Sequence, residues 1–323
     1  MNMWKPVCTA IALCVSACGP PAADAPMNMP ETPIADTTEA PERTAMLSWG
    51  DLLSQPKPSP THAIKIGDGA TDIVDLWLPE TPGPHPVVLM VHGGCWQKEI
   101  ADRTLMNYGA EDLRQRGMAV WNIEYRGVDE TGGGYPGTYL DVANAADALR
   151  VHAETYNLDL NRIAGTGHSA GGHLVSWLAA RSNLPEASLL YMADPISMIG
   201  VLNVGGLADL ELSTRVTERS CLGAILDKLT GPATEDRSDV FSDTSPARLL
   251  PIKVNHISLS GDMDRISPIG LAKDFAARAT QAGGFAQAVI IAGNNHTDLI
   301  SPGTEAFEVQ AEQLASWLSL DQP

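Results

Sequence analysis

The stretch Arg162-Ile-Ala-Gly-Thr-Gly-His-Ser-Ala-Gly-Gly-His-Leu174 has the pattern of a short apolar strand, a tight turn and the start of a helix. Within it, residues 167–171 fit G-x-S-x-G, in which the serine lies at the tip of a strained strand-to-helix turn. The N-terminal end of the following helix favours negative charge beside that serine. Ser169 is therefore a candidate nucleophile, which needs a base, an acid that orients the base and an oxyanion hole.

A second glycine-rich turn follows an early buried strand. Residues 86–91 are continuously apolar, as in a strand buried on both faces, and His92-Gly93-Gly94 comes directly after them. Two adjacent glycines let the backbone direct N–H groups into a shared cavity. We expect Gly93 or Gly94 to donate to an oxyanion together with Ala170. Taken alone, the glycines could mark only a turn, with His92 as a structural histidine.

The base is sought among eight histidines. His296 is the best candidate, because it follows a late strand in the loop Gly293-Asn-Asn-His296, at the sheet edge where open α/β sheets bind ligands. His168 and His173 flank the serine on its own turn and helix, and we expect them to support that turn by packing. We expect surface or core positions for His62, His85 and His152.

Two aspartates compete for the role of the acid. Both lie in Ser260–Pro268, directly after the predicted strand 253–259. We choose Asp264, because Asp262 is closer to the strand end and more suited to bracing the loop, although either could be a turn or capping carboxylate. The resulting order, Ser169, Asp264 and His296, is the order found in α/β-hydrolases.

The rest of the pattern alternates strands and helices after an initial hairpin, which predicts an α/β fold with a mostly parallel central sheet and helices on both faces. Residues 208–245 have weak periodicity and suit a lid or a plain surface excursion. The expected strands are 62–67, 73–78, 86–91, 118–124, 163–166, 199–204, 253–259 and 286–291, and the expected helices are 105–116, 140–156, 170–181, 268–282 and 304–318.

The N-terminal end has the features of an export signal. Lys5 precedes the apolar run 7–17, which is too short to span a bilayer. Small residues before Cys18 favour a bacterial lipoprotein signal with Cys18 lipidated, and cleavage after Ala17 with a soluble product is the alternative. Residues 18–45 are rich in Pro, Ala, Thr and acidic residues and are expected to be a disordered tether. The catalytic domain would then span residues 46–323, in the periplasm or anchored to the outer membrane.

The composition limits the possible partners. The formal net charge of −18 argues against nucleic acid or an anionic membrane surface, so a lipid anchor would be the one membrane contact. Of the five cysteines, Cys95 and Cys221 would remain in an exported protein, where they can pair or stay free. No cysteine or histidine cluster has zinc spacing.

Several motifs together resemble one family. The chain is similar, over about residues 60–320, to the esterase and lipase branch of the α/β-hydrolase superfamily, near its kynurenine formamidase-like and feruloyl esterase-like members. Cys95 stands where that family usually has an aromatic or aliphatic residue, and Ser260 where it often has histidine. The motifs are His92–Gln97, Glu124–Gly127, Gly132–Gly137, Gly167–His173, Asp264–Pro268 and His296–Ile300.

The resemblance implies an α/β-hydrolase fold and hydrolysis of a carboxylic ester in a small-molecule substrate through an acyl-serine, without metal or cofactor. An arylformamide or another amide is the alternative substrate, and a non-catalytic binding protein on the same fold is a more remote one. Trp96 could line the substrate pocket or pack in the core. A dinucleotide-binding site at Gly165–Ala170 is disfavoured, because Glu186 precedes the next strand instead of ending it.

Overall fold

The computed structural model describes Met1, residues 46–217 and residues 221–320. Its centre is one eight-stranded sheet of order β1-β2-β4-β3-β5-β6-β7-β8. The pairs β1–β2 and β2–β4 are antiparallel, and all the other neighbouring pairs are parallel. The strands are β1 (His62–Lys65), β2 (Ile73–Trp77), β3 (His85–Val91), β4 (Ala119–Ile123), β5 (Leu158–His168), β6 (Gly200–Val204), β7 (Asn255–Gly261) and β8 (Phe285–Ile291). The predicted mostly parallel α/β sheet with an initial hairpin is confirmed.

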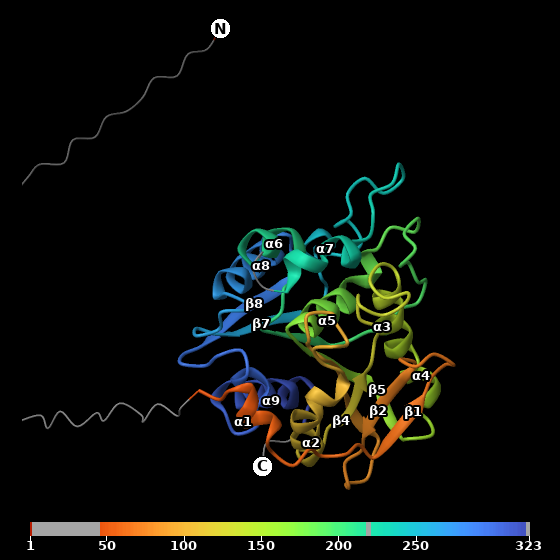
Figure 1. Cartoon of the computed structure of the whole chain (residues 1–323), viewed down its shortest axis with the longest axis vertical. Helices are drawn as coiled ribbons and strands as arrows, with labels where there is room; N and C mark the ends of the chain where they lie inside the picture. The colour runs from red at the N-terminus through yellow and green to blue at the C-terminus, as the bar shows by residue number, and fades with distance from the viewer. Residues whose placement is uncertain (2–45, 218–220, 321–323) are drawn as a thin grey trace, which may run out of the picture. The chain divides into compact units, whose positions relative to one another are not determined.

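Helices cover both faces of this sheet (Figure 1). Residues of α3, α5, α7 and α8 pack in one core cluster, and residues of α1, α2 and α9 pack in the other. The helices are α1 (Trp49–Leu53), α2 (Asn107–Gln115), α3 (Gly137–Asp147), α4 (Leu149–His152), α5 (Ala170–Ala180), α6 (Leu210–Thr217), α7 (Leu222–Thr230), α8 (Ile269–Gln281) and α9 (Glu305–Trp317), with short 3₁₀ turns at Arg103–Met106, Arg181–Asn183, Pro246–Arg248 and Asp298–Ile300.

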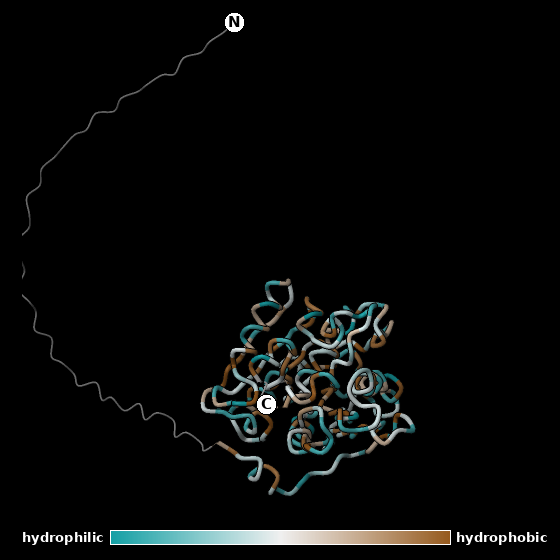
Figure 2. The backbone as a smooth tube through the Cα atoms, turned by 45° about the horizontal axis from the view of Figure 1, so that its top comes forward, coloured by the Kyte–Doolittle hydropathy of each residue, from teal (hydrophilic) through white to brown (hydrophobic). Residues whose placement is uncertain are grey.

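The two cores follow from the period of two along buried strands. On β3, Val87, Leu89 and Val91 face the first cluster, whereas Val88 and Met90 face the second. A strand between two helical layers must be apolar on both faces, which is the continuous apolar run seen in the sequence. Hydrophobic segments accordingly run through the interior of the folded unit in Figure 2.

Some expected elements differ. The single helix expected at 140–156 is two helices, because the chain tightens at Ala148, where the Val151 N–H donates to the Ala148 carbonyl. The stretch 208–245 contains α6 and α7, and α7 buries Leu222, Ile225 and Leu229 on one face. Helix α1 was not expected from the sequence. The signal peptide, Cys18 and the tether fall on residues 2–45, outside the described part of the chain.

In the described ranges, no helix combines the length and the apolar character that crossing a membrane requires.

Candidate active site

Ser169 lies at the turn between β5 and α5, and its backbone is strained. Its φ of 55° and ψ of −118° lie in a region that non-glycine residues rarely adopt, at a typical cost of about 1–3 kcal/mol. The Ser169 N–H donates to the carbonyl of Val204, at the end of β6, at 2.9 Å. The turn is therefore held by the neighbouring strand, with the side chain at the carboxyl edge of the sheet.

The flanking glycines are required by close backbone contacts. A Cβ atom at Gly167 would overlap the carbonyl oxygen of Gly171, and one at Gly171 would overlap the carbonyl oxygens of Val91 and His92. The turn thus packs directly against the end of β3. These contacts explain why the G-x-S-x-G pattern has glycine at both positions.

His296 and Asp264 form a buried pair. The Nδ1–H group of His296 donates to Oδ2 of Asp264 at 2.7 Å, and each residue is 6% exposed. The other carboxylate oxygen, Oδ1, accepts from the backbone N–H groups of Ile266 and Ser267 at 2.8 and 2.9 Å. This fixes the tautomer of His296 with Nε2 unprotonated, the form that can accept a proton.

Asp262, the competing aspartate, has a different partner. Its Oδ1 accepts from the backbone N–H of Gly293 at 2.6 Å. It therefore braces the loop that carries His296 and does not contact the imidazole in the contacts described. The structure joins the histidine to Asp264.

Ser169 and His296 line one cavity of about 240 Å³. No hydrogen bond joins the Ser169 hydroxyl to His296 among the described contacts, and such bonds are commonly long in the absence of substrate. Gly205, at φ 57°, approaches the pair so closely that a Cβ there would lie 3.2 Å from both Asp264 Oδ2 and His296 Cε1. The three candidate residues therefore meet at one place.

His168 connects the serine turn to the histidine loop. Its Nε2 donates to the backbone carbonyl of His296 at 3.0 Å, and the two rings are 4.3 Å apart. Burial holds the pKa of His168 well below its ordinary value. His168 is therefore neutral, and its hydrogen bond holds the backbone of His296 close to the serine turn.

The N–H groups of Gly93 and Gly94, the expected oxyanion donors of this loop, are oriented by contacts to the carbonyls of the same peptide units. Tyr125 Oη donates to the His92 carbonyl at 3.1 Å, and His92 Nδ1 donates to the Gly93 carbonyl at 2.6 Å. In a trans peptide the N–H points opposite to the C=O. These contacts therefore direct the Gly93 N–H away from Tyr125 and the Gly94 N–H away from the His92 ring. A Cβ at Gly93 would lie 3.2 Å from that of Ser169, so the loop lies against the serine. Ala170 begins α5, where N–H groups lack intrahelical partners.

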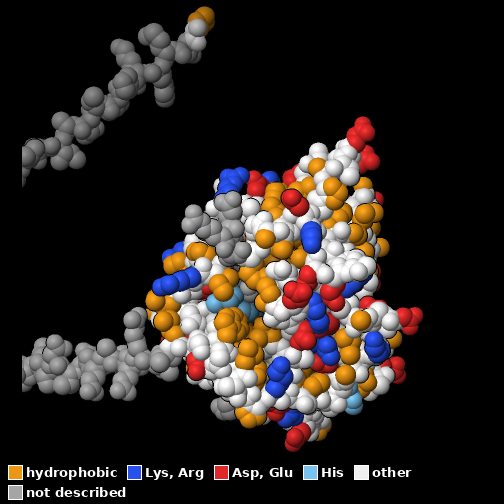
Figure 3. All heavy atoms as spheres, in the orientation of Figure 1, with side chains coloured by type: hydrophobic (Ala, Val, Ile, Leu, Met, Phe, Trp, Pro, Cys, Tyr) orange, Lys and Arg blue, Asp and Glu red, His pale blue; other side chains and the backbone are white. Residues whose placement is uncertain are grey.

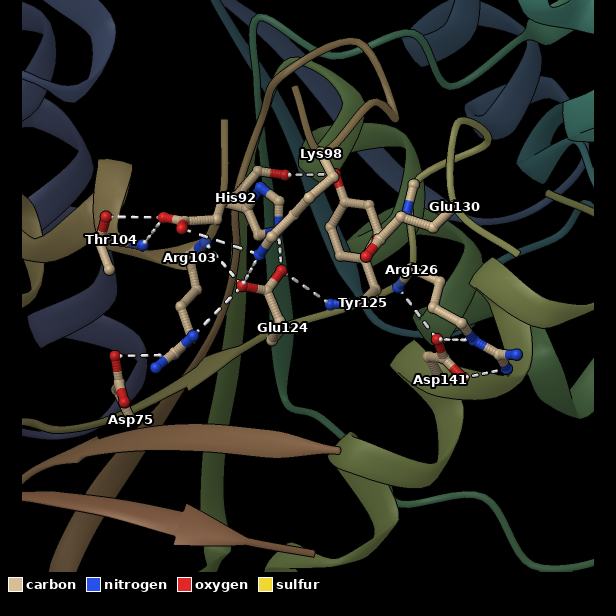
Figure 4. A network of polar contacts seen from close by, with 12 residues as sticks. Asp75, His92, Lys98, Arg103, Thr104, Glu124, Tyr125, Arg126, Glu130 and Asp141 are labelled. Atoms are coloured by element: carbon tan, nitrogen blue, oxygen red, sulfur yellow. Dashed lines mark hydrogen bonds and ion pairs between the residues drawn. The ribbon is translucent and has the colours of Figure 1, made fainter. Parts of the chain in front are cut away.

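Behind this loop, His92 is bound by the buried carboxylate of Glu124 (Figure 4). His92 Nε2 lies 2.9 Å from Glu124 Oε1, while Lys98 Nζ lies 2.6 Å and Arg103 3.3 Å from Oε2. Burial would raise the pKa of Glu124, but His92 and Lys98 outweigh it and hold that pKa well below its ordinary value. Both ring nitrogens of His92 are thus engaged, one by the Gly93 carbonyl and the other by the Glu124 carboxylate.

The next residues of the loop have an unusual backbone conformation and are held by a disulfide and a buried hydrogen bond. Gly94, Cys95 and Trp96 all have positive φ, and Cys95 forms a disulfide with Cys221. Trp96 is 1% exposed, and its indole N–H donates to Nδ1 of His173 at 3.2 Å. It is not among the residues that line the cavity, so the geometry favours the packing role over the pocket role. Cys95, by contrast, does line the cavity.

Sequence reasoning missed several residues around the cavity, among them Trp49, Leu53, Ile100 and Leu105. The one available signal was Ser48-x-x-Asp51, which forms a capping box at the start of α1. Among the residues that the structure describes, no group of three or more His, Cys, Asp or Glu side chains could hold a metal ion.

Comparisons with known proteins agree with this architecture. The chain is 28% identical over 251 residues to Esterase LipC of Mycobacterium tuberculosis, covering 74% of this chain and 59% of that protein. It is 25% identical over 251 residues to the probable isoprenylcysteine alpha-carbonyl methylesterase ICMEL1 of Arabidopsis thaliana, covering 75% and 52%. The chain thus spans between half and three fifths of the length of these curated relatives.

Solved structures show the same fold. Esterase B from Lactobacillus rhamnosis superposes with a TM-score of 0.70 at 18% identity, covering 82% of this chain and 88% of that one. A truncated carbohydrate esterase from gut microbiota gives 0.63 at 18% identity, covering 80% and 95%. The family model BD-FAE matches residues 74–278, which is more than half of the chain. The chain therefore belongs to the BD-FAE family, within the α/β-hydrolase superfamily of esterases and lipases.

Proposed function

We propose that this chain hydrolyses carboxylic esters through an acyl-serine intermediate on Ser169. The observation that carries the proposal is the 2.7 Å hydrogen bond between His296 Nδ1 and Asp264 Oδ2, beside a strained serine that lines the same cavity. The family and the curated relatives, an esterase and a probable methylesterase, support an ester as the substrate class.

The steps follow from the arrangement of these groups. His296 Nε2 accepts the hydroxyl proton of Ser169 as the oxygen attacks the ester carbonyl, and Asp264 stabilises the imidazolium that forms. The N–H groups of Gly93 or Gly94 and of Ala170 stabilise the oxyanion. His296 then protonates the leaving alcohol. Water, deprotonated by His296, attacks the acyl-serine, and the carboxylic acid leaves as Ser169 regains its proton.

Labelling with a fluorophosphonate probe tests the nucleophile. The wild type should be labelled at Ser169 and should hydrolyse 4-nitrophenyl acetate. Ser169→Ala should lose labelling and on the order of 10⁵–10⁶-fold in kcat. Ser182→Ala, at an exposed serine just beyond α5, is the matched control and should behave as the wild type. A folded wild type that resists the probe, or a Ser169→Ala variant with unchanged turnover, would contradict the proposal.

Arylformamide hydrolysis is the second candidate substrate chemistry, because the same serine, acid and base could cleave a formamide. Comparing kcat/KM for 4-nitrophenyl acetate, acetylated and feruloylated sugars, and N-formylkynurenine separates the two. We expect an ester to be preferred, and a preference for N-formylkynurenine would reverse this order.

A further inference from the structure

The catalytic cavity has a wall that comes from the start of the described chain. Trp49 and Leu53 of α1 line the cavity together with Ile100, Leu105 and Ile266. At about 240 Å³ it is smaller than the 300–1,000 Å³ that is typical of sites for drug-sized ligands. None of the side chains described around it belongs to Lys, Arg, Asp or Glu. The space next to Ser169 is therefore small and lacks a charge that could pair with an ionised substrate.

Trp49 lies beside the two histidines of the cavity. Its ring centroid is 6.3 Å from that of His296 and 6.1 Å from that of His168, in edge-on geometry. Trp49, Leu53 and Ile100 are 36%, 51% and 57% exposed, so they also form an apolar rim at the mouth. In Figure 3 the larger of the pale-blue histidine patches on the face shown is bordered by hydrophobic side chains.

Helix α1 is held by the same loop that carries His296. The Leu47 N–H donates to Asp298 Oδ1 at 2.8 Å, and Asn295 Nδ2 donates to the Leu47 carbonyl at 2.9 Å. On the inner side, Leu52 is fully buried in the core that includes α2 and α9. A short helix with these anchors has a fixed position, so Trp49 and Leu53 form a defined wall.

We propose that α1 is a substrate-selecting element, in which Trp49 and Leu53 restrict the ester cleaved at Ser169 to one whose enclosed half is compact, uncharged and apolar. The inference rests on the proposed ester hydrolysis. Helix α1 ends before residue 74, where the match to the family model begins, so this wall is contributed by a segment outside the matched range.

Two ester series measure the length limit. One varies the acyl group of 4-nitrophenyl esters from acetate through butyrate and octanoate to laurate. The other varies the alcohol of acetate esters from methanol to octanol, followed by acid release. In the series that fills the cavity, the wild type should lose at least tenfold in kcat/KM on going from the short to the long members. Trp49→Ala should reduce that loss at least tenfold, because the wall is removed.

Leu53→Ala is the second variant. It removes less of the wall, so it should reduce the loss of kcat/KM with ester length by a smaller factor than Trp49→Ala. Phe285→Ala, at a 70% exposed side chain at the start of β8, is the matched control and should leave the length profile unchanged. Relaxation in one series supports the proposal and identifies which half of the ester is enclosed. Unchanged profiles in both series, with turnover that still depends on Ser169, overturn it and leave the proposed function intact. Absence of Ser169-dependent turnover overturns both.

Charge is tested with a matched pair of substrates. The 4-nitrophenyl hemisuccinate has about the length of the butyrate ester but ends in a carboxylate, which would lose its hydration without gaining a partner. If the acyl half of the ester is the enclosed half, we expect kcat/KM to be at least a hundredfold lower for the hemisuccinate than for the butyrate. Where the length series shows that the acyl half is enclosed, equal values for the two esters would overturn the uncharged class. Where it shows that the alcohol half is enclosed, the same comparison is made with the acetates of butanol and of 4-hydroxybutanoate.

Discussion

Two buried histidine–carboxylate pairs lie at the carboxyl edge of the sheet. His296 and Asp264 follow β8 and β7, and their closest atoms are 2.7 Å apart. His92 and Glu124 follow β3 and β4, at 2.9 Å. In the first pair, no hydrogen bond is described for Nε2 of His296, which lines the cavity, whereas in the second both ring nitrogens bind acceptors.

This difference separates two uses of the same chemistry. A histidine that exchanges protons with substrate needs one unoccupied nitrogen and a partner that fixes its tautomer. A histidine that holds a backbone loop needs both nitrogens engaged, and a second proton strengthens both contacts. The first pair should therefore control proton transfer, and the second should control the direction of the oxyanion donors.

Between the two histidine–carboxylate pairs, the larger effect is expected at Asp264. Asp264→Asn keeps the size of the side chain but removes the charge that stabilises the His296 imidazolium and alters the tautomer. We expect kcat to fall by about 10³–10⁴-fold, with a changed pH–rate profile. Asp262→Asn is the matched control, because the one contact described for the Asp262 carboxylate is with the Gly293 N–H, and it should cost a few-fold at most. Comparable losses in the two variants would remove the distinction between the aspartates.

A smaller effect is expected at Glu124. Glu124→Gln removes the anion that holds His92, and the Gly94 N–H then loses its fixed direction. We expect kcat to fall by about 10–100-fold with KM little changed and the shape of the pH–rate profile preserved, since one oxyanion donor is worth about 10²–10³. Tyr125→Phe removes the hydrogen bond to the His92 carbonyl. It should likewise lower kcat with KM little changed, but by a smaller factor.

The control for Glu124→Gln is a neighbouring carboxylate. Asp141 is buried and binds Arg126 through both oxygens, without a described contact to His92 (Figure 4). Asp141→Asn should lower the midpoint of urea unfolding and leave kcat within about twofold. If Asp141→Asn reduced kcat as much as Glu124→Gln, a general loss of packing would explain both.

Buried histidines without a carboxylate partner should act on stability instead. Burial lowers the pKa values of His173 and His256 to about 4, and it holds the pKa of His168 well below its ordinary value. Below pH 6.5 the unfolded chain therefore binds protons that the folded chain does not, so the free energy of unfolding should decrease as the pH falls from 6.5 toward 5. Each histidine contributes up to about 1.4 kcal/mol per pH unit.

Urea unfolding at several pH values, with the proton uptake measured by calorimetry, checks this stability effect. At pH 5, His256→Gln should reduce the uptake by about one proton, because the unfolded histidine is protonated there and the folded one is not. A free energy of unfolding that is equal at pH 5 and pH 6.5 would contradict the neutral state of these three residues.

The sequence predicted much of the sheet, because buried parallel strands are apolar runs and strained turns need glycine. It also indicated Ser169, Asp264 and His296, because each follows a strand end. It missed α1, whose five residues are too few to show a helical period. It left Cys95 and Cys221 open, because pairing depends on a separation in space, and the structure joins them.

The sequence by itself determined the local features of this protein: the α/β alternation, the serine turn and the positions of its catalytic candidates. These depend on residues within a few positions of one another. Only the tertiary structure decided which partner each polar group has, namely Asp264 for His296 and Glu124 for His92, and which distant side chains line the cavity, Trp49 among them. Such choices depend on contacts between residues far apart in the chain, where burial removes water and the nearest group becomes the partner.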